Sequence, residues 1–92
     1  MSADLLSRPT ILVALVDANG VELTARVQAT HPHDVYQVTQ AGTCTGWLEF
    51  TADGTPIEQR PLAEPCDVAV GARLRMHCDH LGRVRLMPEM LP

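Results

Sequence analysis

Three segments of alternating hydrophobic and polar residues are each interrupted by a short turn-forming sequence. These sequences are "DANG" (17–20), "ADGT" (52–55) and "DHLG" (79–82). Asp, Asn and Gly between alternating segments are typical of β-hairpins, because they tolerate the backbone angles of tight turns. No stretch of helical length shows a 3.6-residue periodicity. The pattern therefore predicts an all-β fold, a small β-barrel or sandwich of about six to eight short strands built from hairpins.

The first hairpin joins "ILVALV" to "VELTARVQA". With Gly20 as the left-handed residue of its turn, Leu15 faces Leu23 and Val13 faces Ala25, which gives one apolar face. Glu22, Thr24 and Arg26 are predicted to point to the other face, together with Leu12, Ala14 and Val16 of the preceding strand. A strand that is apolar on both sides is typical of a central or covered strand. The second face is either covered within the chain or buried by a partner.

The middle hairpin carries Asp53 and Gly54, which favour a two-residue turn. Phe50 then pairs with Ile57, and Trp47 lies opposite Arg60 on the outward face of the sheet, where a cation–π contact is possible. Trp47 is thereby predicted to be exposed.

Two prolines restrict the segment after this turn. Pro56 and Pro61 have no amide hydrogen, so residues 56–60 are an edge strand at best. Short strands are also predicted within 34–40 and 66–70.

The third hairpin, residues 73–86, contains four of the seven arginines. The turn geometry of the first hairpin pairs Cys78 with Val84 and Met76 with Leu86, so the apolar side chains of this hairpin share one face. The opposite face carries Arg73, Arg75, His77, Asp79, Arg83 and Arg85. The arginines cluster because side chains alternate between the two faces of a strand.

The chain has 92 residues, is 46% hydrophobic and carries a formal net charge of −4. We expect one domain over residues 1–92, with 1–9 as a flexible N-terminal segment and 88–92 as a short tail. A domain of this size has a modest core and little room for a deep enclosed active site. The longest apolar run, 11–16, is far too short to span a membrane, so no membrane partner is expected.

Three cysteines cannot form a complete set of disulfides, and the first residues show no signal-peptide pattern. We therefore expect a cytoplasmic chain with free thiols, and the alternation places Cys44, Cys66 and Cys78 inward. The two serines, Ser2 and Ser7, lie in the N-terminal segment, and no hydrolase, metalloprotease or phosphate-binding motif occurs. The sequence thus favours a non-catalytic protein without a cofactor.

The favoured function is protein–protein binding, as a small binding or adaptor module. Trp47 and the apolar outer face formed by Leu12, Ala14 and Val16 are the candidate binding residues, since aromatic and apolar patches are typical of interfaces. Self-association as a homodimer would bury the same face and complete a small core.

Two alternatives remain open. The outward face of the third hairpin (Arg73, Arg75, His77, Arg83 and Arg85) is a candidate site for nucleic acid or another polyanion, although the chain is acidic and this face has no aromatic stacking residue. A metal site through His31, His33, His77 and His80 is the second alternative, although their spacing matches no known ligand pattern.

Overall fold

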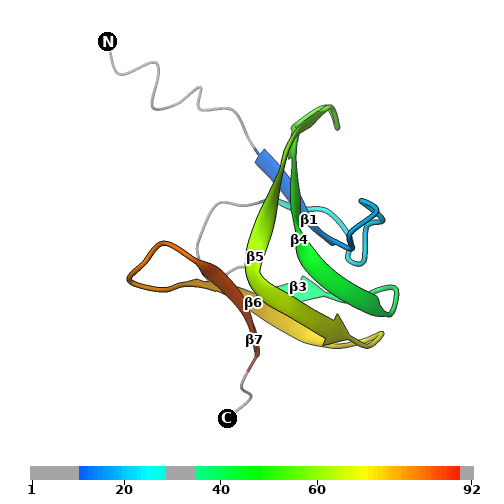
Figure 1. Cartoon of the computed structure of the whole chain (residues 1–92). Helices are drawn as coiled ribbons and strands as arrows, with labels where there is room; N and C mark the ends of the chain where they lie inside the picture. Colours follow the sequence, from blue (N-terminus) through cyan, green and yellow to red (C-terminus); the bar gives the residue numbers. More distant parts are fainter. Residues whose placement is uncertain (1–10, 29–34, 90–92) are drawn as a thin grey trace.

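The computed structural model describes residues 11–28 and 35–89, which form seven β-strands (Figure 1). Their bounds are β1 Ile11–Val16, β2 Val27–Gln28, β3 Tyr36–Gln37, β4 Gly42–Thr51, β5 Pro56–Val68, β6 Arg73–Cys78 and β7 Val84–Pro88. The all-β prediction and the strand number are confirmed. The described residues form no helix long and apolar enough to cross a membrane. Segment 1–9 lies outside the described residues.

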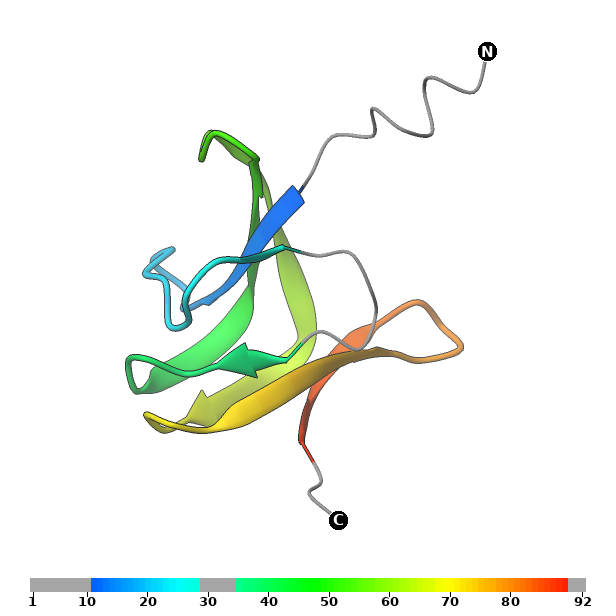
Figure 2. The same ribbon diagram turned by 180° about the vertical axis from the view of Figure 1, so that it is seen from behind.

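The strands form two antiparallel sheets, one in the order β2-β1-β4-β5 and the other in the order β3-β6-β7. In Figures 1 and 2 the smaller sheet lies against the lower halves of β4 and β5. The arrangement is a sandwich-like single domain and not a closed barrel, so of the two predicted architectures the sandwich is the correct one. The core lies between the sheets and consists of Val13, Leu15, Leu23, Tyr36, Val38, Cys44, Leu62, Val68 and Leu74.

All three hairpins use the same three-residue turn. The residue before each turn donates its amide hydrogen to the carbonyl oxygen of the residue after it, over 2.8–3.1 Å (Asp17 to Val21, Thr51 to Thr55, Asp79 to Arg83). The third turn residue is Gly20, Gly54 or Gly82, with φ between 79° and 90°, a conformation that glycine adopts without strain. The turn geometry predicted for the first and third hairpins is confirmed.

The predicted two-residue turn of the middle hairpin is wrong, because Gly54 occupies the third position of a longer loop. Phe50 therefore pairs with Pro56 and not with Ile57. A register irregularity between Glu49 and Phe50 then restores the predicted pairing of Trp47 with Arg60.

Strand β5 joins two segments that were predicted as separate strands, 56–60 and 66–70, and ends at Val68. Its edge position is confirmed. Pro61 pairs with Gly46 and Cys66 pairs with Cys44, so residues 62–65 face the single residue Thr45. This bulge carries β5 toward the second sheet, where Leu62 enters the core.

In the first hairpin the register departs from the prediction after the turn. Leu23 faces Leu15 as expected, with its amide hydrogen donated to the Leu15 oxygen over 2.7 Å. Val13, however, pairs with Val27 and not with Ala25. Thr24 turns inward, is 3% exposed, and accepts a hydrogen bond from the Leu15 amide at 3.1 Å. The prediction that Thr24 points away from Leu23 to the outer face is therefore wrong. Its hydroxyl accepts the hydrogen bond from the Leu15 amide that a backbone carbonyl accepts in a regular hairpin.

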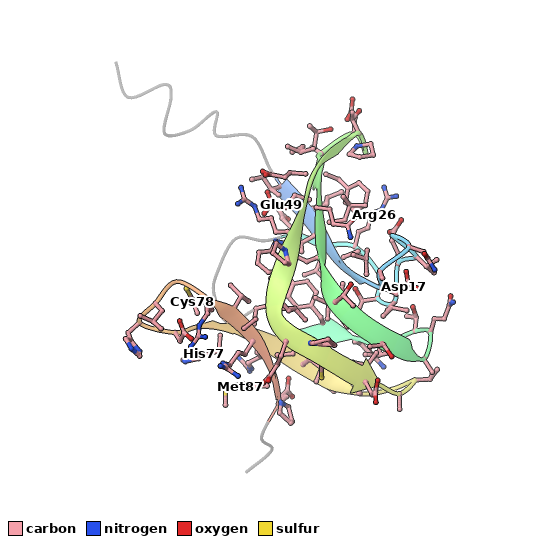
Figure 3. The ribbon with its side chains drawn as sticks, in the orientation of Figure 1. Asp17, Arg26, Glu49, His77, Cys78 and Met87 are labelled. Atoms are coloured by element: carbon pink, nitrogen blue, oxygen red, sulfur yellow. The ribbon has the colours of Figure 1, made fainter. Side chains whose placement is uncertain are left out.

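The second face of β1 is covered within the chain. Ala14 and Val16 are fully buried and Leu12 is half-buried. Their neighbour Phe50, which pairs with Leu12, is capped by Arg26, whose Cζ lies 3.8 Å from the ring centroid. The expectation that this face is an exposed apolar patch is thus wrong, and Figure 3 shows Arg26 beside β1 and β4.

The third hairpin has the predicted register throughout, from Cys78 opposite Val84 to Arg75 opposite Met87. The sheet continues beyond the point where a tail was expected: Pro88 pairs with Leu74, and the Glu89 amide donates to the Arg73 oxygen. The rest of the predicted tail, 90–92, lies outside the described residues.

Candidate functional site

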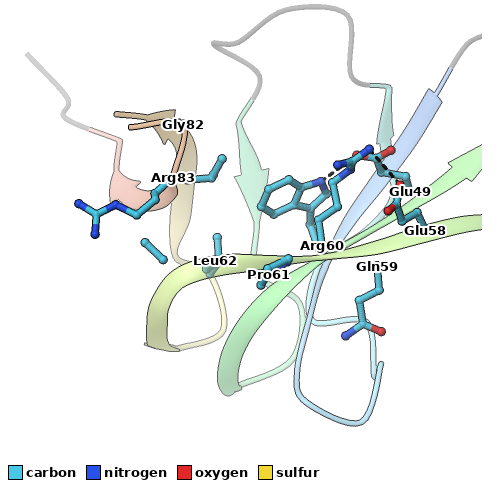
Figure 4. Close-up of a pocket in the computed structure, with 11 residues that line it drawn as sticks. Glu49, Glu58, Gln59, Arg60, Pro61, Leu62, Gly82 and Arg83 are labelled. Atoms are coloured by element: carbon cyan, nitrogen blue, oxygen red, sulfur yellow. Dashed lines mark hydrogen bonds and ion pairs between the residues drawn. The ribbon is translucent and has the colours of Figure 1, made fainter. Parts of the chain in front are cut away.

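A cleft of about 730 Å³ opens between β5 and the β6–β7 hairpin (Figure 4). Both flanking strands, β5 and β7, are the last strands of their sheets. An ion pair joins the two strands, with Arg85 Nη1 2.6 Å from Glu64 Oε1. The cleft is therefore an open wedge between two sheet edges and not an internal cavity.

Trp47 lies in this cleft. It pairs with Leu15, so the two side chains share the core-facing side of the larger sheet, and the indole packs against the core while remaining half-exposed. Cys44 faces the same core although it lies three residues away, because the β4–β5 register is irregular between Cys44 and Gly46. The prediction that Trp47 lies on the outer face of the sheet is wrong for this reason.

The indole is held by a carboxylate. Trp47 Nε1 donates to Glu49 Oε2 over 3.0 Å, and Arg60 Nε donates to the same oxygen over 2.9 Å (Figure 4). Arg60 also contacts Glu58 over 2.9 Å. The polar edge of the indole is therefore satisfied within the chain.

Apolar residues from both flanking strands complete the cleft. Leu62 is buried, Val84 is half-buried and Ala63 is exposed at the rim. Arg83 lies at the hairpin side, paired with Asp79 over 3.1 Å. The cleft thus has an apolar floor and a charged rim.

The predicted protein-binding residues are separated by the larger sheet. Trp47 lies on its core side, whereas Leu12, Ala14 and Val16 lie on the other side, under the segment that carries Arg26. The structure does not bring the four residues together.

The arginine-rich face of the third hairpin forms as predicted, but its arginines lie beside carboxylates. The closest distances are 3.3 Å for Arg73–Glu89, 3.9 Å for Arg75–Glu89, 3.1 Å for Arg83–Asp79 and 2.6 Å for Arg85–Glu64. Hydrogen bonds from the backbone amides of Arg83 and Leu81, with the Arg83 charge, hold the pKa of Asp79 below its ordinary value. These carboxylates offset most of the positive charge that a polyanion would need.

The predicted metal ligands are not brought together. His77 and His80 are both exposed, and His31 and His33 lie outside the described residues. Within 11–28 and 35–89 no three His, Cys, Asp or Glu side chains are grouped closely enough to hold a metal ion.

The three thiols are free and differ in exposure. Cys44 is buried as predicted, and Cys66 is half-buried. The expected burial is wrong for Cys78, which is exposed at the end of β6 although Val84, opposite it, packs against the core.

Three residues that shape the cleft were not identified from the sequence. Leu62 lines the cleft because β5 bulges at this point, and Val84 lines it because β7 lies close to β5. Neither the bulge nor the contact between the two strands can be predicted from the local sequence pattern. Glu49 did carry a signal, because it lies two residues after Trp47 on the same face of the strand.

Comparison of the chain with protein-family models, curated proteins and solved structures gives no match.

Proposed function

We propose that this chain is a small, non-catalytic binding module that holds an extended protein segment in the cleft beside Trp47. The observation that carries the proposal is a half-exposed indole, fixed by Glu49, in a cleft between two edge strands. A fixed aromatic side chain contributes contact area without losing much conformational entropy on binding.

The composition of the cleft supports this proposal. Interfaces combine an apolar centre with a polar rim, and tryptophan and arginine are enriched among the residues that dominate binding energy. Here Trp47, Leu62 and Val84 supply the centre, and Arg60 and Arg83 supply the rim. The volume also lies within the range of about 300–1,000 Å³ that is common for ligand sites.

The position of the cleft favours a protein segment over a small molecule. An extended segment can lie along an edge strand and place alternate side chains into a neighbouring pocket. Pro61 and Pro65 have no amide hydrogen, so β7 is the better of the two edges for such pairing. The charged rim residues are ion-paired with one another, which favours an uncharged side chain as the group that enters the cleft.

Both carboxylates at the cleft are engaged by Arg60, Glu49 through Nε and Glu58 through Nη2. A carboxylate whose oxygen already contacts a guanidinium within the chain is less available to contact a ligand. This pairing supports a binding role without catalysis.

The proposal is tested by panning a random peptide library, displayed on phage, against the wild-type chain. Synthetic copies of the selected peptides are then titrated while Trp47 fluorescence is followed. We expect dissociation constants of about 1–100 μM and a change in Trp47 emission.

The matched variants are Ala63→Arg and Ala69→Arg. Both alanines are exposed, but only Ala63 lines the cleft. Ala63→Arg is expected to weaken binding by tenfold or more, and Ala69→Arg is expected to leave it unchanged. Equal affinity of the wild type and Ala63→Arg, or a selection that yields no binder, would contradict the proposal.

A second copy of the chain is one source of the bound segment that we include in this proposal. Sedimentation of the wild type and of Ala63→Arg tests it directly. A dimer that Ala63→Arg dissociates would identify the partner as a second copy, and a monomer at all concentrations would exclude a second copy as the partner.

A further inference from the structure

Two of the three cysteines, Cys44 on β4 and Cys66 on β5, lie directly opposite each other. Direct partners in an antiparallel sheet have Cα atoms about 4.5–5.5 Å apart, which lies within the span of about 4.4–6.8 Å that a disulfide bridges. Their side chains project from the same face, and both contact the core. The geometry of a cross-strand disulfide is therefore present while both thiols are free.

The register that brings the two cysteines together is fixed by the next pair along the sheet. Thr43 lies opposite Asp67, and its hydroxyl donates to Asp67 Oδ1 over 2.8 Å. Beyond them Gly42 lies opposite Val68, which is buried in the core. The cysteine pair is thus held in place by its neighbours on one side and adjoins the bulge of β5 on the other.

We propose that Cys44 and Cys66 are a redox-active pair, which a hydroperoxide oxidises to a cross-strand disulfide and a dithiol reductant restores.

The two sulfurs lie in different environments, and this difference sets the order of the steps. Cys66 is half-buried, so a small peroxide can reach it. Cys44 is fully buried, and its thiol donates to the Gly46 carbonyl oxygen over 3.3 Å. Burial also raises the pKa of the Cys44 thiol, which keeps it protonated until the second step.

In the first step the Cys66 thiolate attacks a peroxide oxygen. The O–O bond breaks, a sulfenic acid forms on Cys66, and the leaving oxygen takes a proton to depart as an alcohol or water. In the second step the Cys44 sulfur attacks the Cys66 sulfur and the S–O bond breaks. The hydroxide that leaves takes the Cys44 proton and departs as water, so two thiols lose the two electrons that the hydroperoxide gains.

Cys78 provides the control, because it is exposed at the end of β6 in the other sheet. In a Cys78→Ser chain, hydrogen peroxide is expected to lower the free-thiol count from two to zero, and dithiothreitol is expected to restore it. Non-reducing peptide mapping of this chain and of the wild type is expected to find Cys44 joined to Cys66 within one molecule.

Different results would overturn the proposal. One is a Cys66 peptide that gains oxygen atoms while Cys44 keeps its thiol, and another is a disulfide that joins Cys44 or Cys66 to a second molecule. A chain with both Cys66→Ser and Cys78→Ser is expected to keep its Cys44 thiol while folded. Loss of that thiol at the rate seen in the paired chain would overturn the assignment of Cys66 as the first nucleophile.

Discussion

At the scale of single residues, two positions determine where the chain departs from a regular pattern of alternation. Gly46 lies at the close approach of β4 and β5, and Thr24 replaces a backbone acceptor in the first hairpin. Neither role can be predicted from sequence, because both depend on how closely backbone atoms of the neighbouring strand approach. The turn glycines, in contrast, were predictable, since their conformation is a local property.

Substituting Gly46 by alanine is expected to destabilise the fold by more than about 3 kcal/mol, since the added Cβ is forced into a backbone that cannot yield. That Cβ would lie 2.2 Å from the carbonyl oxygen of Arg60. Urea unfolding of Gly46→Ala measures the loss. Gly42→Ala is the control in the same strand, because its Cβ would meet only the Leu23 side chain at 3.2 Å, and its effect is expected to stay within about 1 kcal/mol. Equal stability of the two variants would show that the strands do not approach as closely as described.

Substituting Thr24 by valine is expected to cost about 1–3 kcal/mol, because the Leu15 amide would be left buried without its acceptor. Thr24→Ser keeps the hydroxyl and is expected to lose less stability than Thr24→Val. Chemical denaturation of both variants decides the matter. A serine variant that is the less stable of the two would indicate that the methyl group matters more than the hydrogen bond.

At the scale of the elements, the hairpins show how much of the strand register can be predicted from the sequence. The register of the β6–β7 hairpin could be predicted fully, because its turn is local and its alternation is uninterrupted. The register of β4 and β5 could be predicted only in part: Trp47 lies opposite Arg60 as expected, but Phe50 pairs with Pro56, and no local residue preference indicates that residues 62–65 bulge opposite Thr45. The apolar residues on both sides of β1 indicated that its second face is covered, but not which residues cover it, since the cover depends on Arg26 folding back over Phe50.

The ion pair between Glu22 and Arg26 holds Arg26 over Phe50, and it predicts that the stability of the fold depends on pH. Glu22 accepts hydrogen bonds from Arg26 at 2.8 and 3.0 Å, and the bonded guanidinium lowers the pKa of Glu22 from its ordinary value of about 4.5. A carboxyl group whose pKa is lowered by folding stabilises the folded state above its unfolded pKa, and this contribution disappears as the pH falls through the folded pKa. Both side chains are partly exposed, so the contribution is less than about 1 kcal/mol.

Thermal unfolding of the wild type and of Glu22→Gln between pH 7 and pH 2 checks this dependence. The wild type is expected to unfold at a higher temperature than the variant at pH 7, and the difference is expected to disappear below the folded pKa of Glu22. A difference that persists unchanged at pH 2 would contradict the role assigned to the ion pair.

At the scale of the whole molecule, the sequence predicted the fold class and the arginine-rich face but not the cleft. The cleft arises where two sheet edges diverge, and that arrangement depends on how the sheets pack. The irregular register between Cys44 and Gly46 placed Trp47 on the core side of its sheet, opposite to the side that carries Leu12, Ala14 and Val16. The sequence therefore identified Trp47 and the arginine-rich face of the third hairpin. It did not show that Trp47 lies in a cleft or that carboxylates lie beside the arginines.

The most direct test of the central claim is a two-dimensional ¹⁵N–¹H NMR titration of the wild-type chain with a peptide selected against it. We expect the largest shifts at the Trp47 indole N–H and at the backbone amides of Leu62, Ala63 and Val84. Shifts confined to the outward residues of β6 and β7, or to the segment around Arg26 that covers β1, would contradict binding in the cleft.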